Sequence, residues 1–383
     1  MNRINCTSKS VDNPIDFLIV GGGINGLSVA ISLLEKSPHA KVTILERGLL
    51  PCGATSKNGG FGMWVGFTEV IQDIEDFGLD KAIAINIKRK SGLDILMKRL
   101  NNDPSIFQKV GAFDIILSEE LHQLDQLDSI NKAFARELGI TDLFQVRNDQ
   151  IEALGFNPQL AKALVYHDYK YRIHSGKVVV GLIELFQKLG GRYLTGAPVV
   201  SRSSRPDGLV DVFVGNPDTK VVFRAKTVIY AVNAFHHLMD KTSLVEPLRG
   251  HVMVTKPIKD LKLVSSVTLD VSYYYLRVID NRIIIGGGLL DYESDKTNEM
   301  RTTEAYREHL VQKLHEIFPS LEFEPDYFWA GVMGMHKNRD IYSATQIEKG
   351  VWNLFACNGY GMMLNSFVGR EAADLISQKL EQK

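Results

Sequence analysis

Three glycines near the start of the chain, Gly21, Gly23 and Gly26, have the spacing of a phosphate-binding turn. They follow the apolar run "DFLIV" and open an amphipathic run that reaches Lys36. A GxGxxG turn between a strand and a helix needs positive φ, a place where backbone approaches a pyrophosphate, and close packing of helix on strand. The helix N-terminus adds roughly half a positive charge that faces the phosphates. We therefore predict that a dinucleotide binds at this turn.

A carboxylate stands where the ribose of such a dinucleotide is bound. Glu46 follows Gly26 by twenty residues, at the end of the strand-like run "KVTILE". A carboxylate at that place accepts hydrogen bonds from both hydroxyls of an adenosine ribose. NAD-binding and FAD-binding proteins share this fingerprint, so the motif alone does not choose between the two cofactors.

The segment after this strand favours FAD. The sequence "LLPCGATSKNGGFGMW", residues 49–64, is rich in small residues and offers Thr55, Ser56, Asn58 and backbone N–H groups. An NAD-binding unit would turn straight into its next helix here. An ordinary surface loop remains the alternative, because glycine, serine and asparagine are also loop formers.

A second glycine-broken turn opens a helix at the other end of the chain. The sequence "CNGYGMMLNSFVGREAADLIS", residues 357–377, predicts a turn at Gly359 and Gly361 and an amphipathic helix from Met362 onward. A strand, a turn and a terminal helix without a ligand is the structural alternative. We expect the two glycine-opened helices to serve one bound molecule.

The elements that position these residues alternate in type along the chain. Residues 16–46 are predicted to form one strand–helix–strand unit, residues 80–155 to be mainly helical with an extended stretch at 111–118, and a helix to begin at Ser175. Residues 190–290 have the alternation of strands, with a hairpin turn at Asp280 and Asn281. A helix, two strands and the final helix follow. This order predicts an α/β fold with a Rossmann-like nucleotide-binding domain and an interleaved domain built on an antiparallel sheet.

Composition fits an ordinary soluble globular enzyme. The chain of 383 residues is 45% apolar and 23% charged, has a formal net charge of −1, and is long enough for two domains. No run is long and apolar enough for a membrane span, and no basic stripe indicates nucleic-acid binding. Cys6, Cys52 and Cys357 lack the spacing of metal ligands, so we expect no metal and a reducing, cytoplasmic setting. The first fourteen residues do not resemble a signal peptide.

One strand carries residues that suit a small-molecule substrate. In "SYYYLRV" the alternation places Tyr273, Tyr275 and Arg277 on one face, where they could supply hydroxyl donors and a bidentate anion clamp. A solvated outer face is the alternative. His251 shares a face with Arg249, and it has either a structural role or a role near the substrate. His174 is expected to cap the helix that begins at Ser175.

The motifs together resemble one known family. The runs "DFLIVGGGINGLSVAISLL", "VTILERG", "GATSKNGG", "TVIYAVNAF", "RIIIGGG", "WAGVMG" and "CNGYGMML...GREAADLI" are similar to those of the D-amino-acid-oxidase-type (DAO) FAD-dependent oxidoreductases, which include glycine, sarcosine and γ-glutamylputrescine oxidases. The resemblance covers residues 16–376. It implies FAD as the cofactor, with residues 14–82, 164–240 and 336–383 in the FAD-binding domain and residues 83–163 and 241–335 in the substrate-binding domain.

The resemblance also implies roles for individual residues. The cofactor-binding residues it implies are Gly21, Gly23 and Gly26 at the pyrophosphate, Glu46 and Arg47 near the ribose, Thr55, Ser56, Asn58 and Gly59 on the path to the flavin, Val199 at the adenine, Asn233 beside the phosphates, and Gly331, Gly359, Gly361 and Met362 around the flavin ring. Substrate-side or catalytic roles are expected for Tyr275, Arg277, His251, His336 and Tyr360.

The chain departs from amino-acid oxidases of the family at one instructive place. Those enzymes hold the substrate carboxylate with an arginine in a GxRP motif, whereas here Met333 lies in "GVMG". The stretch that ends in Asn338 and Arg339 is more similar to the γ-glutamylputrescine oxidase branch. Residues 334–337 contain no cysteine, so the resemblance implies that FAD is held noncovalently.

These expectations define a reaction and its alternatives. The family's activity is oxidation of the C–N bond of an amine or amino-acid-like substrate to an imine, by hydride transfer to flavin N5, with oxygen, a quinone or a partner flavoprotein as the electron acceptor. An FAD-dependent 2-hydroxy-acid dehydrogenase and a non-catalytic flavin-binding protein remain open as alternatives.

Overall fold

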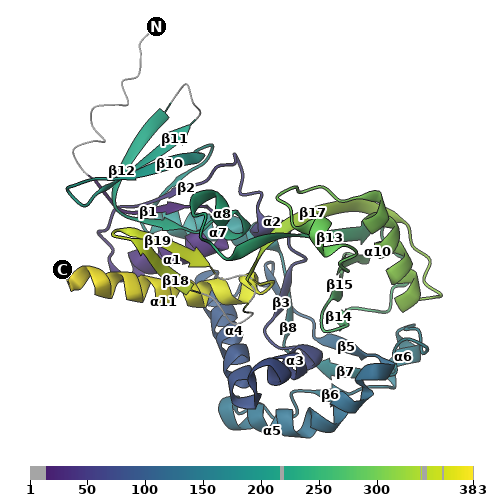
Figure 1. Cartoon of the computed structure of the whole chain (residues 1–383). Helices are drawn as coiled ribbons and strands as arrows, with labels where there is room; N and C mark the ends of the chain where they lie inside the picture. Colours follow the sequence, from purple (N-terminus) through teal and green to yellow (C-terminus); the bar gives the residue numbers. More distant parts are fainter. Residues whose placement is uncertain (1–13, 216–219, 337, 339–342, 356–357, 383) are drawn as a thin grey trace.

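The computed structural model describes residues 14–215, 220–336, 338, 343–355 and 358–382 (Figure 1). Strands of one sheet and strands of a second sheet alternate along the chain, so each sheet gathers segments that are far apart in sequence. The predicted α/β fold with two interleaved parts is therefore confirmed.

The first sheet has parallel strands at its centre, as a nucleotide-binding unit requires. Its strands are β1 (Ile15–Val20), β2 (Val42–Leu45), β9 (Arg192–Leu194), β10 (Val199–Ser204), β11 (Val210–Gly215), β12 (Lys220–Tyr230), β18 (Ser343–Glu348) and β19 (Val351–Phe355). Strand β1 lies between β2 and β12, and all of these pairings are parallel. Strands β10, β11 and β18 join by antiparallel pairing. The apolar runs of β1 and β2 are buried, which is why they form the centre of this sheet.

Long helices pack beside this sheet. They are α1 (Ile24–Lys36), α4 (Leu79–Arg99), α7 (Ser175–Lys188) and α11 (Gly361–Glu381). Figure 1 shows the yellow α11 crossing the sheet beside α1 and meeting α4. Two glycines allow this close packing, because a Cβ at Gly369 would lie 2.7 Å from the Ser28 carbonyl carbon and one at Gly92 would lie 1.8 Å from the Met363 carbonyl oxygen. His174 caps α7 as predicted, since its Nδ1 accepts a hydrogen bond from the Lys177 N–H at 3.3 Å.

The second sheet is antiparallel except at one pair. Its order is β17 (Pro325–His336), β13 (Val245–Thr255), β16 (Arg282–Gly287), β15 (Tyr274–Ile279), β14 (Ser266–Leu269), β5 (Ala112–Ile116), β7 (Ala163–His167) and β6 (Gln145–Val146). Strands β14 and β5 run parallel, which the sequence patterns did not predict. Asp280 and Asn281 both have positive φ and form the predicted hairpin turn between β15 and β16.

A small third sheet lies between the two large ones. It contains β3 (Phe61–Met63), β4 (Phe107–Lys109) and β8 (Lys170–Ile173). The remaining elements are α2 (Ala54–Lys57), α3 (Phe67–Phe77), η1 (Ser118–Gln126), α5 (Leu127–Leu138), α6 (Gln150–Ala153), η2 (Asn233–Phe235), α8 (His236–Met239), α9 (Tyr292–Asp295) and α10 (Glu304–Ile317). Strand β7 belongs to the second sheet, although nearly all of its residues lie in the segment 164–240 that was assigned to the FAD-binding domain. The domain boundaries remain a prediction.

Two further features concern the described residues only. None of their helices combines the length and the apolar run that a membrane crossing requires. No cluster of three or more His, Cys, Asp or Glu side chains in the same part of the chain is placed to hold a metal ion.

Candidate active site

A single large cavity runs from the glycine turn of the first sheet to the face of the second sheet. Its volume is about 1240 Å³, and both glycine-opened helices reach its wall. Pockets that hold one small ligand typically measure roughly 300–1,000 Å³. The cavity is therefore large enough for a cofactor together with a substrate.

The glycine turn at one end of the cavity admits no larger residues. Gly21 has φ +108°, and a Cβ there would lie 2.5 Å from the Ala231 carbonyl oxygen. A Cβ at Gly26 would lie 2.0 Å from the Gly21 carbonyl oxygen. Gly26 does not line the cavity, so it contributes by letting α1 pack on the turn. Positive φ at Gly21 and close packing at Gly26 are two of the three demands predicted from the spacing of the motif.

The N-terminus of α1 faces the cavity with its positive end exposed to a ligand. Gly23 is the N-cap residue and offers no side-chain cap, and the first turn contains no acidic residue. Thr55 supplies the nearest polar group, because the Ile24 N–H donates to its Oγ1 at 3.0 Å. An uncapped helix N-terminus beside a hydroxyl is a site for an anion such as a phosphate.

Glu46 is held rigidly at the adjoining wall. Its Oε2 accepts from the Gly22 N–H and its Oε1 from the Gly48 N–H, each at 2.9 Å. Each carboxylate oxygen keeps a further lone pair for a hydroxyl of a ligand. Arg47 also lines the cavity, with its guanidinium 4.0 Å from the centroid of the Phe235 ring.

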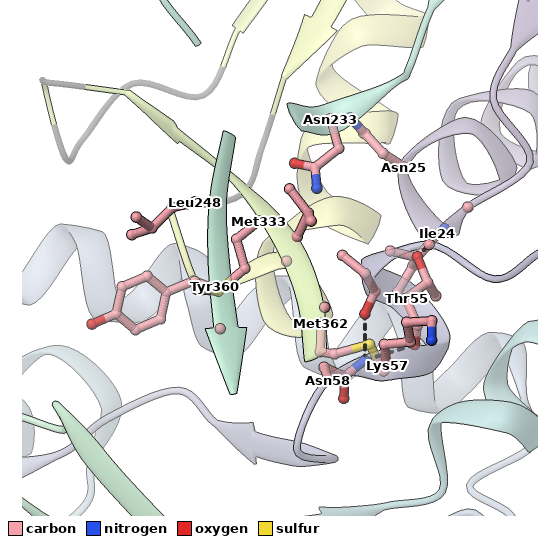
Figure 2. Close-up of a pocket in the computed structure, with 18 of the residues that line it drawn as sticks. Ile24, Asn25, Thr55, Lys57, Asn58, Asn233, Leu248, Met333, Tyr360 and Met362 are labelled. Carbon is pink, nitrogen blue, oxygen red and sulfur yellow. Dashed lines mark hydrogen bonds between the residues drawn. The ribbon is translucent and has the colours of Figure 1, made fainter. Parts of the chain in front are cut away.

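The loop after β2 forms the middle of the wall. Figure 2 shows Thr55, Lys57, Asn58 and Met362 gathered on one side of the cavity. The Asn58 amide is used within the protein, because Oδ1 accepts from the Gly60 N–H at 2.7 Å and Nδ2 donates to the Thr55 carbonyl oxygen at 2.6 Å. Asn58 therefore shapes the loop and presents little free polar surface.

Ser56 does not reach the cavity, in contrast to the prediction. Its hydroxyl donates to the Pro51 carbonyl oxygen at 2.8 Å, and the residue is exposed at the outside of α2. Gly59 and Gly331 do line the cavity as predicted. The Lys57 carbonyl oxygen accepts from Trp329 Nε1 at 2.9 Å, which fastens α2 to β17 of the second sheet.

The opening of α11 completes the cofactor side of the cavity. Gly359 has φ +86°, and Tyr360 is the N-cap residue without a side-chain cap. The first turn of α11 contains no acidic residue, and Gly361 and Met362 line the cavity. Val199 and Asn233 also line it, and Asn233 Oδ1 accepts from the Gly334 N–H at 3.2 Å. The two glycine-opened helices therefore meet the same cavity, as the sequence predicts.

Tyr275 of β15 in the second sheet lines the cavity beside Gly59 and Phe61. Its ring packs edge-on against Phe61 with centroids 4.9 Å apart, and burial raises the pKa of its phenol to about 12. The hydroxyl therefore stays protonated at every physiological pH and acts as a hydrogen-bond donor. Tyr273, predicted to share this strand face, lies in the turn before β15; it is exposed and donates to the Leu289 carbonyl oxygen at 3.1 Å.

Arg277 shares the predicted face but lies behind the cavity wall. Its Nη1 donates to the Ile173 carbonyl oxygen at 3.4 Å, and a Cβ at Gly60 would lie 2.5 Å from its Nη2. Burial and the nearby Arg172 lower the pKa of its guanidinium to about 10. Arg277 does not line the cavity, so the structure does not place this guanidinium against a substrate.

The predicted histidines have partners outside the reaction space. His251 reaches the cavity edge, but its Nε2 lies 3.2 Å from Asp295 Oδ1 and its ring stacks on Tyr306 with centroids 3.6 Å apart. Burial lowers its pKa. His336 does not line the cavity, and its backbone N–H donates to Asn358 Oδ1 at 2.7 Å. Both histidines therefore hold the structure around the cavity together.

Tyr360 lines the cavity as predicted and connects it to a buried charged cluster. The Arg89 guanidinium lies 3.6 Å from the centroid of the Tyr360 ring, and Arg89 Nη1 lies 3.2 Å from Asp73 Oδ2. Glu69 of α3 and Lys170 of β8 belong to the same region and line the cavity. Burial raises the pKa of Glu69 and lowers that of Lys170 to about 8.

Sequence patterns did not reveal this cluster. Glu69 and Asp73 are four residues apart, so helical spacing predicts that they share one face of α3, but charged helical faces are usually solvated. The only available signal was that Phe67, Val70 and Ile71 surround Glu69 in the same short helix. Asn338 is described, whereas Arg339 and Cys357 lie outside the described residues.

The donor set fits FAD. A glycine cradle that a Cβ would fill, the oriented carboxylate of Glu46 and two uncapped helix N-termini all face one cavity. These features suit a pyrophosphate, a ribose and a ring system that accepts negative charge. Fold and site together define a protein that binds a dinucleotide across a parallel sheet.

Comparison with known proteins identifies the family. The family model described as "FAD dependent oxidoreductase" (DAO) matches residues 16–375, so the chain belongs to the DAO family of FAD-dependent oxidoreductases. It is an FAD-dependent oxidoreductase, as the resemblance of its motifs predicts.

Three similar proteins illustrate how far the likeness extends. The chain is 24% identical to the "Probable oxidoreductase OrdL" of Haemophilus influenzae, over 94% of this chain and 82% of that protein. It is 24% identical to the "Gamma-glutamylputrescine oxidoreductase" of Escherichia coli, over 96% of this chain and 84% of that protein. The dithionite-reduced L-α-glycerophosphate oxidase of Mycoplasma pneumoniae with FAD bound has a TM-score of 0.74 and 20% identity, with 95% of each chain covered. The last likeness supports the fold.

Proposed function

We propose that this protein oxidises the C–N bond of an amine or amino-acid-like substrate to an imine. The observation that carries the proposal is the composition of the cavity wall at the second sheet. Glu69 supplies a carboxylate in this cavity, Met333 stands where the family resemblance implies an arginine in the amino-acid oxidases, and Arg277 does not line the cavity. The Glu69 carboxylate favours a cationic group, and the replacement of that arginine disfavours a substrate that must be held by a carboxylate on its reacting carbon.

The residues of the chain bind and orient the substrate in this proposal. FAD, when bound, accepts a hydride at N5 from the carbon next to the substrate nitrogen. Tyr275 keeps its proton and donates a hydrogen bond from its hydroxyl, which orients the substrate. The apolar side chains of Phe61, Leu248 and Met333 line the same space and exclude water from it. Water then hydrolyses the imine after release.

The first turn of α11 is expected to stabilise the reduced cofactor. The N–H groups of Gly361 and Met362 lie at a helix N-terminus with no acidic residue nearby in sequence. A positive dipole end favours negative charge at that place. Noncovalent binding of FAD is part of the proposal, since residues 334–337 contain no cysteine.

The relatives support the proposal and also define its main alternative. The name of the Escherichia coli relative states an amine substrate, and that of the Mycoplasma pneumoniae enzyme states an alcohol substrate. An alcohol therefore remains the second candidate substrate class, with a 2-hydroxy acid as the member that the sequence analysis left open. Arg277 weighs against the 2-hydroxy acid, because this arginine does not line the cavity and so does not hold a carboxylate on the reacting carbon. The electron acceptor and the cytoplasmic setting stay predictions.

Anaerobic reduction of the bound flavin tests the proposal. The FAD-loaded protein is mixed without oxygen with primary amines, secondary amines, D-amino acids and 2-hydroxy acids, and the visible flavin absorbance is followed. We expect amines to bleach the flavin. Bleaching by 2-hydroxy acids alone would establish the second candidate, and a flavoprotein that no substrate bleaches would be a non-catalytic flavin-binding protein.

A further inference from the structure

Two buried groups of opposite charge face the cavity without a hydrogen-bond partner. Glu69, in the first turn of α3, is 3% exposed and its Oε2 has no partner. Lys170, the first residue of β8, is fully buried and its Nζ has no partner. Both side chains line the cavity, and within the described chain they form no ion pair with each other.

The neighbouring charges are engaged elsewhere. Arg89 Nη1 lies 3.2 Å from Asp73 Oδ2 and 3.9 Å from Glu69 Oε2, and its guanidinium packs on the Tyr360 ring. Asp114 accepts a hydrogen bond from the Phe67 N–H at 2.7 Å and another from the Thr268 hydroxyl. Glu69 and Lys170 are therefore the members of this cluster that keep free hydrogen-bonding capacity toward the cavity.

The surroundings of Glu69 and Lys170 make it energetically costly to leave Oε2 and Nζ without hydrogen-bond partners. Lys170 Nζ lies 4.3 Å from the centroid of the Phe61 ring, so an apolar face replaces water beneath the ammonium. A buried charge without a partner is strongly destabilising unless a group of opposite charge compensates it. Ser272 also lines the cavity, with its buried hydroxyl beside Glu69.

We propose that this end of the cavity is a subsite for a zwitterionic end group of the substrate, with an ammonium on Glu69 and a carboxylate on Lys170. The inference rests on the proposed amine oxidation and names the substrate class: an amine whose remote end is an α-amino acid group. An uncharged amide would satisfy the hydrogen bonds but would bring no opposite charge to Lys170, which forms no ion pair among the described residues, and none to Glu69 beyond the 3.9 Å contact with Arg89. A diamine would satisfy Glu69 alone, and an ω-amino acid would satisfy Lys170 alone.

Matched substrates separate these possibilities. L-Lysine carries both end groups, cadaverine lacks the carboxylate, ε-aminocaproate lacks the α-ammonium, and pentylamine lacks both. The corresponding set built on L-ornithine tests a shorter spacing. We expect the wild-type protein to show the highest kcat/KM for flavin reduction with the zwitterionic member of one set, by roughly tenfold or more over each partial analogue, since hydrogen bonds to charged groups have about that effect.

Substitutions assign each half of the end group to its residue. Glu69→Gln should raise KM roughly tenfold for L-lysine and cadaverine but not for ε-aminocaproate, and Lys170→Met should raise it for L-lysine and ε-aminocaproate but not for cadaverine. Asp73→Asn is the matched control, because Asp73 is buried in the same cluster but does not line the cavity. The Asp73→Asn variant should leave the ranking of the substrates by kcat/KM unchanged. Flavin content and melting temperature report folding of each variant.

The results distinguish this inference from the proposed function. Equal kcat/KM values across both wild-type sets would overturn the subsite, and so would variants that affect all members of a set alike. The wild-type comparison decides the question even where a variant does not fold. If no amine reduced the flavin, the proposed function would fall. The end-group preference would then be measured by titrating the oxidised flavin spectrum with the same compounds, and equal dissociation constants would overturn the subsite.

Discussion

Gly92→Ala tests the helix packing that places α11 at the cavity. In the interior of a helix, alanine is normally more favourable than glycine by about 1 kcal/mol. Here the new Cβ would lie 1.8 Å from the Met363 carbonyl oxygen and 2.9 Å from the carbonyl carbon. Both contacts are with backbone, so no rotamer change relieves them. Overpacking costs roughly 1–3 kcal/mol, and a 1.8 Å contact with backbone belongs in the upper part of that range, above the gain in helix propensity.

The substitution should therefore lower stability by about 1–2 kcal/mol and also weaken retention of FAD. The second effect follows because Met362 and Met363 in the first turn of α11 line the cavity. Thermal unfolding is followed by far-UV circular dichroism and by flavin fluorescence. Gly176→Ala in α7 is the control, since its Cβ would meet nothing closer than 3.4 Å, and it should leave the melting temperature unchanged or raise it. A Gly92→Ala protein that melts at or above the wild-type temperature would refute the reasoning.

Three further predictions concern the cofactor, the substrate and the pH dependence of stability. Glu46→Gln should weaken FAD binding roughly tenfold, because an amide donor would face the Gly22 or Gly48 N–H; an unchanged dissociation constant from calorimetric titration would argue against the ribose contact. Tyr275→Phe should lower kcat/KM by about tenfold to a hundredfold, and a Phe variant of full activity would remove the role of the hydroxyl. Since the pKa of Tyr275 is about 12, the wild-type pH profile should show no ionisation of this group below about pH 10. Burial lowers the pKa of His167 to about 3, against about 6.5 in the unfolded chain, so the folded state binds fewer protons and stability should fall as pH drops from about 6.5 toward 3. His167→Asn should reduce that loss in urea midpoints measured across this range, and an identical loss would contradict the assignment.

The cofactor side of the site was predictable because its requirements are local. Gly21 and Gly359 have positive φ, and Gly26 has no room for a Cβ. Each position therefore requires glycine for a local reason, and the glycine spacing between a strand and a helix shows this in the sequence. Glu46 follows from the length of one strand–helix–strand unit. Neither inference depends on how distant segments pack.

The substrate side depends on distant packing, and there the sequence was a weaker guide. Period-two alternation correctly placed Tyr275 and Arg277 on one face, yet only Tyr275 of the two lines the cavity, because the Arg277 guanidinium packs against Gly60 and Ile173 beside the third sheet. Glu69 and Lys170 carry charges that usually remain in water. Their burial arises because α3 and β8, about a hundred residues apart, meet beside β5.

The central claim is that the cavity between the two sheets binds FAD and oxidises an amine at the carbon beside nitrogen. The most direct measurement is anaerobic stopped-flow reduction of the bound flavin by a primary amine that reduces it, compared with the same amine deuterated at that carbon. The account predicts loss of the visible flavin absorbance at a rate that falls with deuterium, and an aldehyde and ammonium as products after hydrolysis. Flavin that stays oxidised with every amine but is reduced by a 2-hydroxy acid would contradict it.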